Sequence, residues 1–287
     1  MPPLPSFAEL ARMPDDALDV VLGAALVARD AYDDLDVPAL LDELAALGNP
    51  DDEAGVATDP TAPLRDRVVA VSRRFEGHGF RGNAEDYYDP KNSLLPDVLS
   101  RRLGIPITLS IVWCAMAERA GLIARGIAFP GHFLVRVDAS RVDDETQSGT
   151  PIVVDPFAAG RILDAGAATA LLRRALGEGA QLHASLFTPA TARATLVRLL
   201  TNLEATWAKR GEHARAFVAA DRIVTLVPDG ARMLRERAAL ALRIGAIEVA
   251  RADLMRVIEL EPQAPDIPHI EARLAKLVAR GAKATLH

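Results

Sequence analysis

Apolar residues recur at every third or fourth position through the first part of the chain, which predicts amphipathic helices. This spacing covers residues 6–47, and Asp36 followed by Val and Pro marks the start of a second helix there, which runs through Leu47. A polar loop rich in Pro and Asp over residues 49–63 ends this region. The pattern then predicts one more helix over residues 64–75.

Residues 94–121 are expected to be mainly helical, with a break at residues 104–106, where the sequence is Gly-Ile-Pro. The piece after the break, ITLSIVWCAMAERAG, is apolar on nearly all sides, so we expect a buried helix. Gly121 is suited to end it.

Three short runs rich in β-branched residues follow, over residues 123–129, 133–137 and 152–155, and they predict strands. The stretch between the last two, VDASRVDDETQSGTP, resembles a hairpin-like excursion without core-forming residues. A buried helix followed by antiparallel strands indicates an α+β domain.

The last third of the chain has a helical pattern throughout and repeats itself with an offset of 34 residues. Identical residues recur at Leu200/Leu234, Ala205/Ala239, Gly211/Gly245, Ala216/Ala250, Arg222/Arg256, Leu226/Leu260 and Pro228/Pro262. This period, with Gly at the turn and Pro behind the second helix, is typical of tetratricopeptide repeats. We therefore expect repeats at about residues 197–230 and 231–264 and a closing helix at about 268–280. The predicted domains are residues 1–187, which are α+β, and an all-α module over residues 188–287.

Composition narrows the class of protein. The 287 residues carry a net charge of −6 without a concentrated Lys/Arg stripe, which argues against nucleic-acid binding. The acids are concentrated early, since residues 1–60 hold fourteen of them against Arg12 and Arg29. No apolar run approaches the roughly 18–20 residues that cross a bilayer, and the start of the chain lacks the features of a secretion signal. One cysteine excludes an internal disulfide and a cysteine-cluster metal site, and the histidines lack metal-binding spacing. We expect a cytoplasmic protein without metal, cofactor, nucleic-acid partner or membrane contact.

The candidate catalytic residues lie in three segments. These are GIPITLS at a helix start, PGHFLVRV at the start of a strand and VVDPF at the end of another strand. A helix start concentrates free N–H groups, which favour a nucleophile or an oxyanion. His132 on a strand facing that terminus could act as the base, and Asp155 on the next strand could fix its tautomer. Thr108 and Ser110 supply hydroxyls near the helix start.

The run DYYDPKNSLLPDVLSRRLGIPITLS, followed by PGHFLVRV and VDPF, resembles the bacterial SirB family. That resemblance covers nearly the whole chain and implies a transglutaminase-like, papain-like core followed by tetratricopeptide repeats. In the wider transglutaminase-like superfamily the catalytic His opens a strand and the Asp closes the next, and these positions match His132 and Asp155.

The superfamily's nucleophilic cysteine has no counterpart, because the matching position, fifteen residues before Gly121, is Pro106. Cys114 lies eight residues further on, roughly 12 Å along the helix axis and about 80° around it. A cysteine in the middle of an apolar helix more often fills the core than reacts. Thr108 and Ser110 remain the alternatives, although hydroxyls at helix starts commonly serve as caps or packing groups.

Polar residues in DPKNS form a second candidate group. Asn92 and Ser93 either make a turn and a helix cap or form a cleft wall in which the amide binds an oxyanion. Tyr88 is a candidate for the same wall.

Two functions remain open at this point. A degenerate transglutaminase-like scaffold that binds a protein or peptide fits Pro106 and the repeats, which commonly offer a concave peptide groove. A hydrolase or acyltransferase would instead use Thr108 or Ser110 with His132 and Asp155. The oligomeric state is not predicted.

Overall fold

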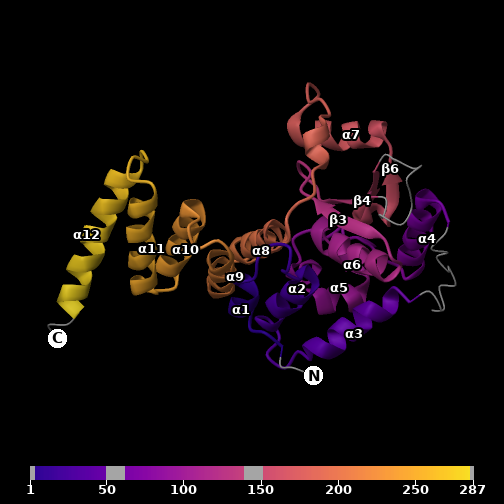
Figure 1. Cartoon of the computed structure of the whole chain (residues 1–287). Coiled ribbons are helices and arrows are strands. Elements are labelled where there is room, and N and C mark those ends of the chain that lie inside the picture. The colour runs from indigo at the N-terminus through magenta and orange to yellow at the C-terminus, as the bar shows by residue number, and fades with distance from the viewer. Residues whose placement is uncertain (1–3, 50–61, 139–150, 285–287) are drawn as a thin grey trace. The chain divides into compact units, whose positions relative to one another are not determined.

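The computed structural model describes residues 4–49, 62–138 and 151–284, with side chains described up to residue 277 (Figure 1). Most of the polar loop expected over 49–63 and of the excursion over 137–151 lies outside the described residues. The chain forms two compact units, Met1–Leu199 and Leu200–His287.

The first unit is α+β, as predicted. Its helices are α1 (Phe7–Ala11), α2 (Val20–Arg29), α3 (Val37–Leu47), α4 (Leu64–Gly77), α5 (Leu95–Arg101), α6 (Pro106–Arg119) and α7 (Ala165–Leu176). Short 3₁₀ turns are η1 (Pro90–Asn92), η2 (Pro156–Ala158) and η3 (Ala184–Phe187). The strands are β1 (Arg81–Gly82), β2 (Leu103–Gly104), β3 (Ile123–Ile127), β4 (Leu134–Asp138), β5 (Ile152–Asp155) and β6 (Arg161–Leu163).

Strands β3 to β6 form an antiparallel sheet in the order β3-β4-β5-β6, with Val135 of β4 opposite Val154 of β5. Side chains alternate between its faces, so neighbouring residues enter different cores. Val135 packs in the core that contains α6, whereas Leu134 packs with Leu172 of α7 on the other face. β1 and β2 make a separate parallel pair, and β1 contacts the turn η2.

Helix α6 is the centre of the first unit. Figure 1 shows it beside β3 and β4, with α2, α3, α4 and α5 on its other sides. Trp113 and Met116 are fully buried, which explains why its sequence is apolar all round. The helix begins at Pro106, whose fixed backbone angle and missing N–H suit the first helical position.

The second unit is a stack of antiparallel helix pairs. It contains the later part of α8 (Ala192–Lys209), α9 (His213–Leu226), α10 (Ala231–Arg243), α11 (Ile247–Leu260) and α12 (Ile267–Ala284). Gly211 and Gly245 occupy the turns inside the pairs with φ of 77° and 80°, and an added Cβ would meet nothing within 4 Å at either. These glycines are therefore needed for backbone conformation and not for close packing. Helices α9 and α11 end two residues before Pro228 and Pro262, as the repeat pattern predicts.

Candidate functional site

The sequence resemblance places the superfamily's nucleophile at the start of α6, and the polar groups there already have hydrogen-bond partners. Thr108 is fully buried. Its Oγ1 donates to the carbonyl of Asn92 at 2.7 Å and accepts from the backbone N–H of Ile105 at 3.2 Å. The Thr108 hydroxyl thus ties the helix start to the loop before it, and its proton is directed at a carbonyl oxygen and not at a histidine.

His132 and Asp155 lie side by side because they occupy the same end of two neighbouring strands. His132 precedes β4 by two residues and Asp155 ends β5, which runs antiparallel to β4. His132 Nε2 lies 2.9 Å from Asp155 Oδ1, with side chains only 12% and 4% exposed. The same Oδ1 accepts from the backbone N–H groups of Phe157 at 3.0 Å and Ala158 at 3.3 Å. Asp155 therefore both orients the imidazole and caps the turn η2.

No hydroxyl completes this pair within the described part of the chain. Ser110 is buried, and its Oγ donates to the carbonyl of Phe133 at a long 3.5 Å. Asp155 is the hydrogen-bond partner of the His132 ring among the described residues, and neither Thr108 nor Ser110 donates to that ring. The structure brings His132 and Asp155 together and leaves both candidate nucleophiles bonded elsewhere.

Asn92 has both ends of its buried amide occupied. Oδ1 accepts from Asn83 Nδ2 at 3.0 Å, and Nδ2 donates to the carbonyl of Asp86 at 2.7 Å. Ser93 next to it is buried as well. These contacts fix the loop that leads into α5, and oxyanion binding by Asn92 would require its amide to give up a bond.

Aromatic side chains connect Tyr88 to His132. Tyr88 is 53% exposed and meets Tyr87 edge-on, with ring centroids 5.4 Å apart. Tyr87 lies 6.4 Å from Phe157, whose ring meets the imidazole of His132 edge-on at 5.8 Å. Burial raises the pKa of Tyr87. Phe157 was not predicted as part of this wall, although its place directly after Asp155–Pro156 is the signal that could have found it.

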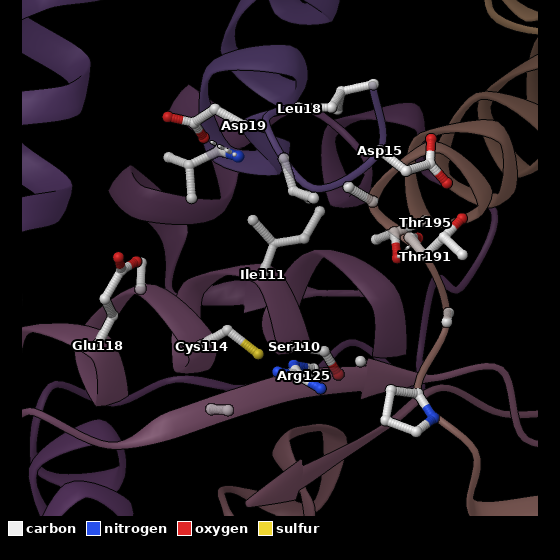
Figure 2. Close-up of a pocket in the computed structure, with 18 of the residues that line it drawn as sticks. Asp15, Leu18, Asp19, Ser110, Ile111, Cys114, Glu118, Arg125, Thr191 and Thr195 are labelled. Atoms are coloured by element: carbon white, nitrogen blue, oxygen red, sulfur yellow. Dashed lines mark hydrogen bonds between the residues drawn. The ribbon is translucent and has the colours of Figure 1, made fainter. Parts of the chain in front are cut away.

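A cavity of about 940 Å³ lies elsewhere in the first unit, and sequence reasoning did not find it. Figure 2 shows Ser110, Ile111, Cys114 and Glu118 of α6 around it, together with Asp15, Leu18 and Asp19, Arg125 of β3, and Thr191 and Thr195. His132 is not among the residues that line it. Its walls come from residues 15–21, from residues 110–126 with Phe133, and from residues 189–195, which are far apart in sequence. The acidic start of the chain was the one available signal for its charge.

Cys114 is half-buried at this cavity, and not fully enclosed as a residue that only fills the core would be. Desolvation, reinforced by the negative charge of Glu118, raises the pKa of its thiol to about 12. The thiol therefore stays protonated at neutral pH and is a poor nucleophile.

Neither a metal site nor a membrane span appears in the part of the chain that the structure describes. No group of three or more His, Cys, Asp or Glu side chains there could hold a metal ion. No helix among the described residues is long and apolar enough to cross a membrane.

Comparison with known proteins gives the same two-part architecture. Residues 38–201 match the transglutaminase-like superfamily, and residues 203–275 match the tetratricopeptide repeat. A UPF0162 protein of Xylella fastidiosa strain 9a5c is 37% identical over 278 residues, which is 96% of this chain and 95% of that protein. The UPF0162 protein PA3419 of Pseudomonas aeruginosa is 30% identical over 268 residues, 93% of each chain. The mouse F-box only protein 21 is 27% identical over 169 residues, 58% of this chain and 26% of that protein.

The superfamily match covers more than half of the chain, and the UPF0162 relatives align over nearly their full length. The resemblance to the SirB family is narrower than these matches and stays a prediction. The chain belongs to the transglutaminase-like superfamily and, within it, to the UPF0162 proteins, with tetratricopeptide repeats following the core.

Proposed function

We propose that this chain is a binding protein for another protein or a peptide, built on a transglutaminase-like core that has lost thiol catalysis. The observation that carries the proposal is the start of α6, where Pro106 stands at the position that the sequence resemblance assigns to the nucleophile. The nearest hydroxyl, on Thr108, is buried and bonded to the carbonyl of Asn92. The thiol of Cys114 lies two turns further along the helix and is protonated at neutral pH.

The second unit supports the same function. Residues 203–275 match the tetratricopeptide repeat, a helix-pair motif whose stacked units commonly present an extended surface to a peptide or protein. A cytoplasmic location, in which a lone cysteine stays reduced, belongs to the same proposal.

The hydrolase or acyltransferase is the second candidate, and the observation that favours it is the His132–Asp155 pair at 2.9 Å. A histidine oriented by a carboxylate is a competent general base once a nucleophile lies within hydrogen-bond reach. In this second candidate, Ser110 would have to turn its hydroxyl from the Phe133 carbonyl towards the imidazole.

One pair of assays on the full-length chain separates the two candidates. The first measures hydrolysis and acyl transfer on a panel of activated esters and amides, with the wild type and His132→Asn side by side. The second selects binders from a displayed library of random twelve-residue peptides. We expect the library to yield peptides that bind the wild type and His132→Asn with equal affinity. We expect no turnover that depends on His132. Turnover that His132→Asn abolishes would establish the hydrolase, and a library without binders would overturn the binding function.

A further inference from the structure

Strand β3 lies at one edge of the four-stranded sheet, so one of its sides has no neighbouring strand. In an antiparallel ladder the N–H and C=O of a residue point to the same side, and successive residues alternate. The carbonyl of Gly126 accepts from the backbone N–H of Ala190 at 2.8 Å, so Gly126 points away from β4. Ala124, two residues earlier, points the same way. Among the described residues, no backbone group outside the sheet bonds to Ala124.

The cavity described above runs along this free edge. Ala124, Arg125 and Gly126 line it together with Ser110 and Cys114 of the facing helix α6. Ala124 has a small side chain and Gly126 has none, so the N–H and C=O of Ala124 and the N–H of Gly126 are open to an incoming chain. The C=O of Gly126 is already bonded to Ala190. A larger residue at Gly126 does not fit, because an added Cβ would lie 2.4 Å from the ring of Phe133.

The rim of the cavity is acidic. Asp15, Asp16, Asp19 and Glu118 line it against the single cation Arg125. Asp15 is paired with Arg193 at 2.9 Å, and Asp19 accepts from backbone N–H groups at the start of α2. The side-chain carboxylates of Asp16 and Glu118 make no hydrogen bond or ion pair with a described residue. The uncompensated charge therefore favours a cationic ligand.

We infer that the free edge of β3 binds an extended peptide segment with basic side chains, which adds to the sheet as a further strand. This inference rests on the proposed function and names its ligand class and binding mode. Main-chain hydrogen bonds to Ala124 and the N–H of Gly126 supply the pairing, as in other proteins that bind peptides by strand addition. Small apolar side chains of the peptide enter the cavity beside Ile111 and Phe133, and its Lys or Arg side chains reach the acidic rim.

Ala124→Pro tests the pairing, because it removes only an N–H that points away from β4. Proline is tolerated on edge strands where the N–H is not part of the ladder. We expect peptides selected from the random library to bind the Ala124→Pro chain about tenfold more weakly or worse. Ala124→Val is the matched control, since it keeps the N–H and suits a strand, and it should retain more of the affinity.

Amide hydrogen exchange on the unaltered chain gives a second measurement that needs no variant. Bound peptide should slow exchange at Ala124 and Gly126 and leave Arg125 unchanged, because the Arg125 N–H already belongs to the ladder with β4. Unchanged exchange at both Ala124 and Gly126 would overturn the inference even if Ala124→Pro failed to fold.

A triple variant tests whether the acidic rim attracts basic peptides. It neutralises the rim with Asp16→Asn, Asp19→Asn and Glu118→Gln together. Asparagine at position 19 still caps α2, so the helix start is retained. We expect selected peptides to be enriched in Lys and Arg and to lose about tenfold in affinity at low salt. The control neutralises exposed acids that do not line the cavity, with Asp33→Asn, Asp34→Asn and Asp42→Asn, and should leave binding unchanged.

The outcomes distinguish this inference from the function on which it rests. Peptides that bind the chain but are not basic, or that bind the Ala124→Pro chain as tightly as the wild type, would overturn the edge-strand site alone. A library without any binders would overturn both.

Discussion

The His132–Asp155 pair offers the most direct test of whether the core is structural or catalytic. Asp155 Oδ1 accepts from His132 Nε2 at 2.9 Å and from the N–H groups of Phe157 and Ala158 at 3.0 and 3.3 Å, and its side chain is 4% exposed. His132→Ala removes one of these donors. Asp155→Ala removes the acceptor, so that two backbone N–H groups at the start of η2 lose their cap.

The two costs follow from the number of bonds lost. Leaving a buried carboxylate short of one partner costs about 1–3 kcal/mol, which is the expected effect of His132→Ala. Asp155→Ala loses the same bond and also a cap worth about 0.5–2 kcal/mol, so it should destabilise the first unit by about 1.5–5 kcal/mol. The double variant should cost less than the sum, with a coupling energy of about 0.5–3 kcal/mol, because both single changes break one shared contact.

Urea unfolding followed by tryptophan fluorescence measures these free energies. The chain has two tryptophans, and Trp207→Phe leaves Trp113, buried in α6, as the reporter of the first unit. The reasoning is refuted if His132→Ala changes the free energy of unfolding by less than about 0.5 kcal/mol, or if the two single effects are additive. A small loss of stability together with a loss of measurable turnover would instead assign the pair to catalysis.

Three further predictions concern ionisable groups that are at least partly buried. Burial raises the pKa of Glu204 to about 7. Between about pH 4.5 and 7, the folded chain therefore keeps a proton on Glu204 that the unfolded chain has released. The free energy of unfolding falls as the pH rises through this range. Glu204→Gln should remove this pH dependence and stabilise the second unit at pH 8 by about 1 kcal/mol, after allowance for solvent screening. Melting curves of both proteins at pH 5 and 8 measure the difference. Arg237→Met leaves the buried carboxylate of Asp253 without its guanidinium and should cost about 3–5 kcal/mol in urea unfolding, so a cost below about 1 kcal/mol would contradict that role. Cys114, with a thiol pKa of about 12, should react with a thiol reagent at pH 8 on the order of a thousandfold more slowly than in urea-unfolded chain.

Periodicity predicts the helices of this fold well because their burial repeats along the sequence. The all-round apolar pattern of residues 107–121 anticipates the buried helix α6, and Gly211 and Gly245 anticipate two turns of the repeats. The three-residue strand β6 was missed, since Arg161–Leu163 is too short to show alternation. Strand β6 forms because it pairs with β5, and this pairing is not visible in the local sequence pattern.

In the candidate site, too, one part could be predicted from the sequence and another could not. His132 and Asp155 could be placed together because one opens a strand and the other closes its antiparallel neighbour, so topology alone makes them adjacent. The cavity at the edge of β3 could not be predicted, because its wall combines residues 15–21, part of α6, β3 and residues 189–195. Only the folded chain brings these segments together.

The segments DPKNS and GIPITLS, which suggested a nucleophile and an oxyanion site, are explained by one hydrogen-bond network. The carbonyl of Asn92 accepts from Thr108 Oγ1 at 2.7 Å and from the N–H of Ile105 at 3.3 Å. Asn83 closes the network, since its side chain donates to Asn92 and its N–H donates to the carbonyl of Gly104 at 3.0 Å. The polar groups that could have served a reaction at the start of α6 instead hold that start against the preceding loop. Buried polar groups that are fully paired in this way rigidify a fold, and this is what a binding protein requires of its core.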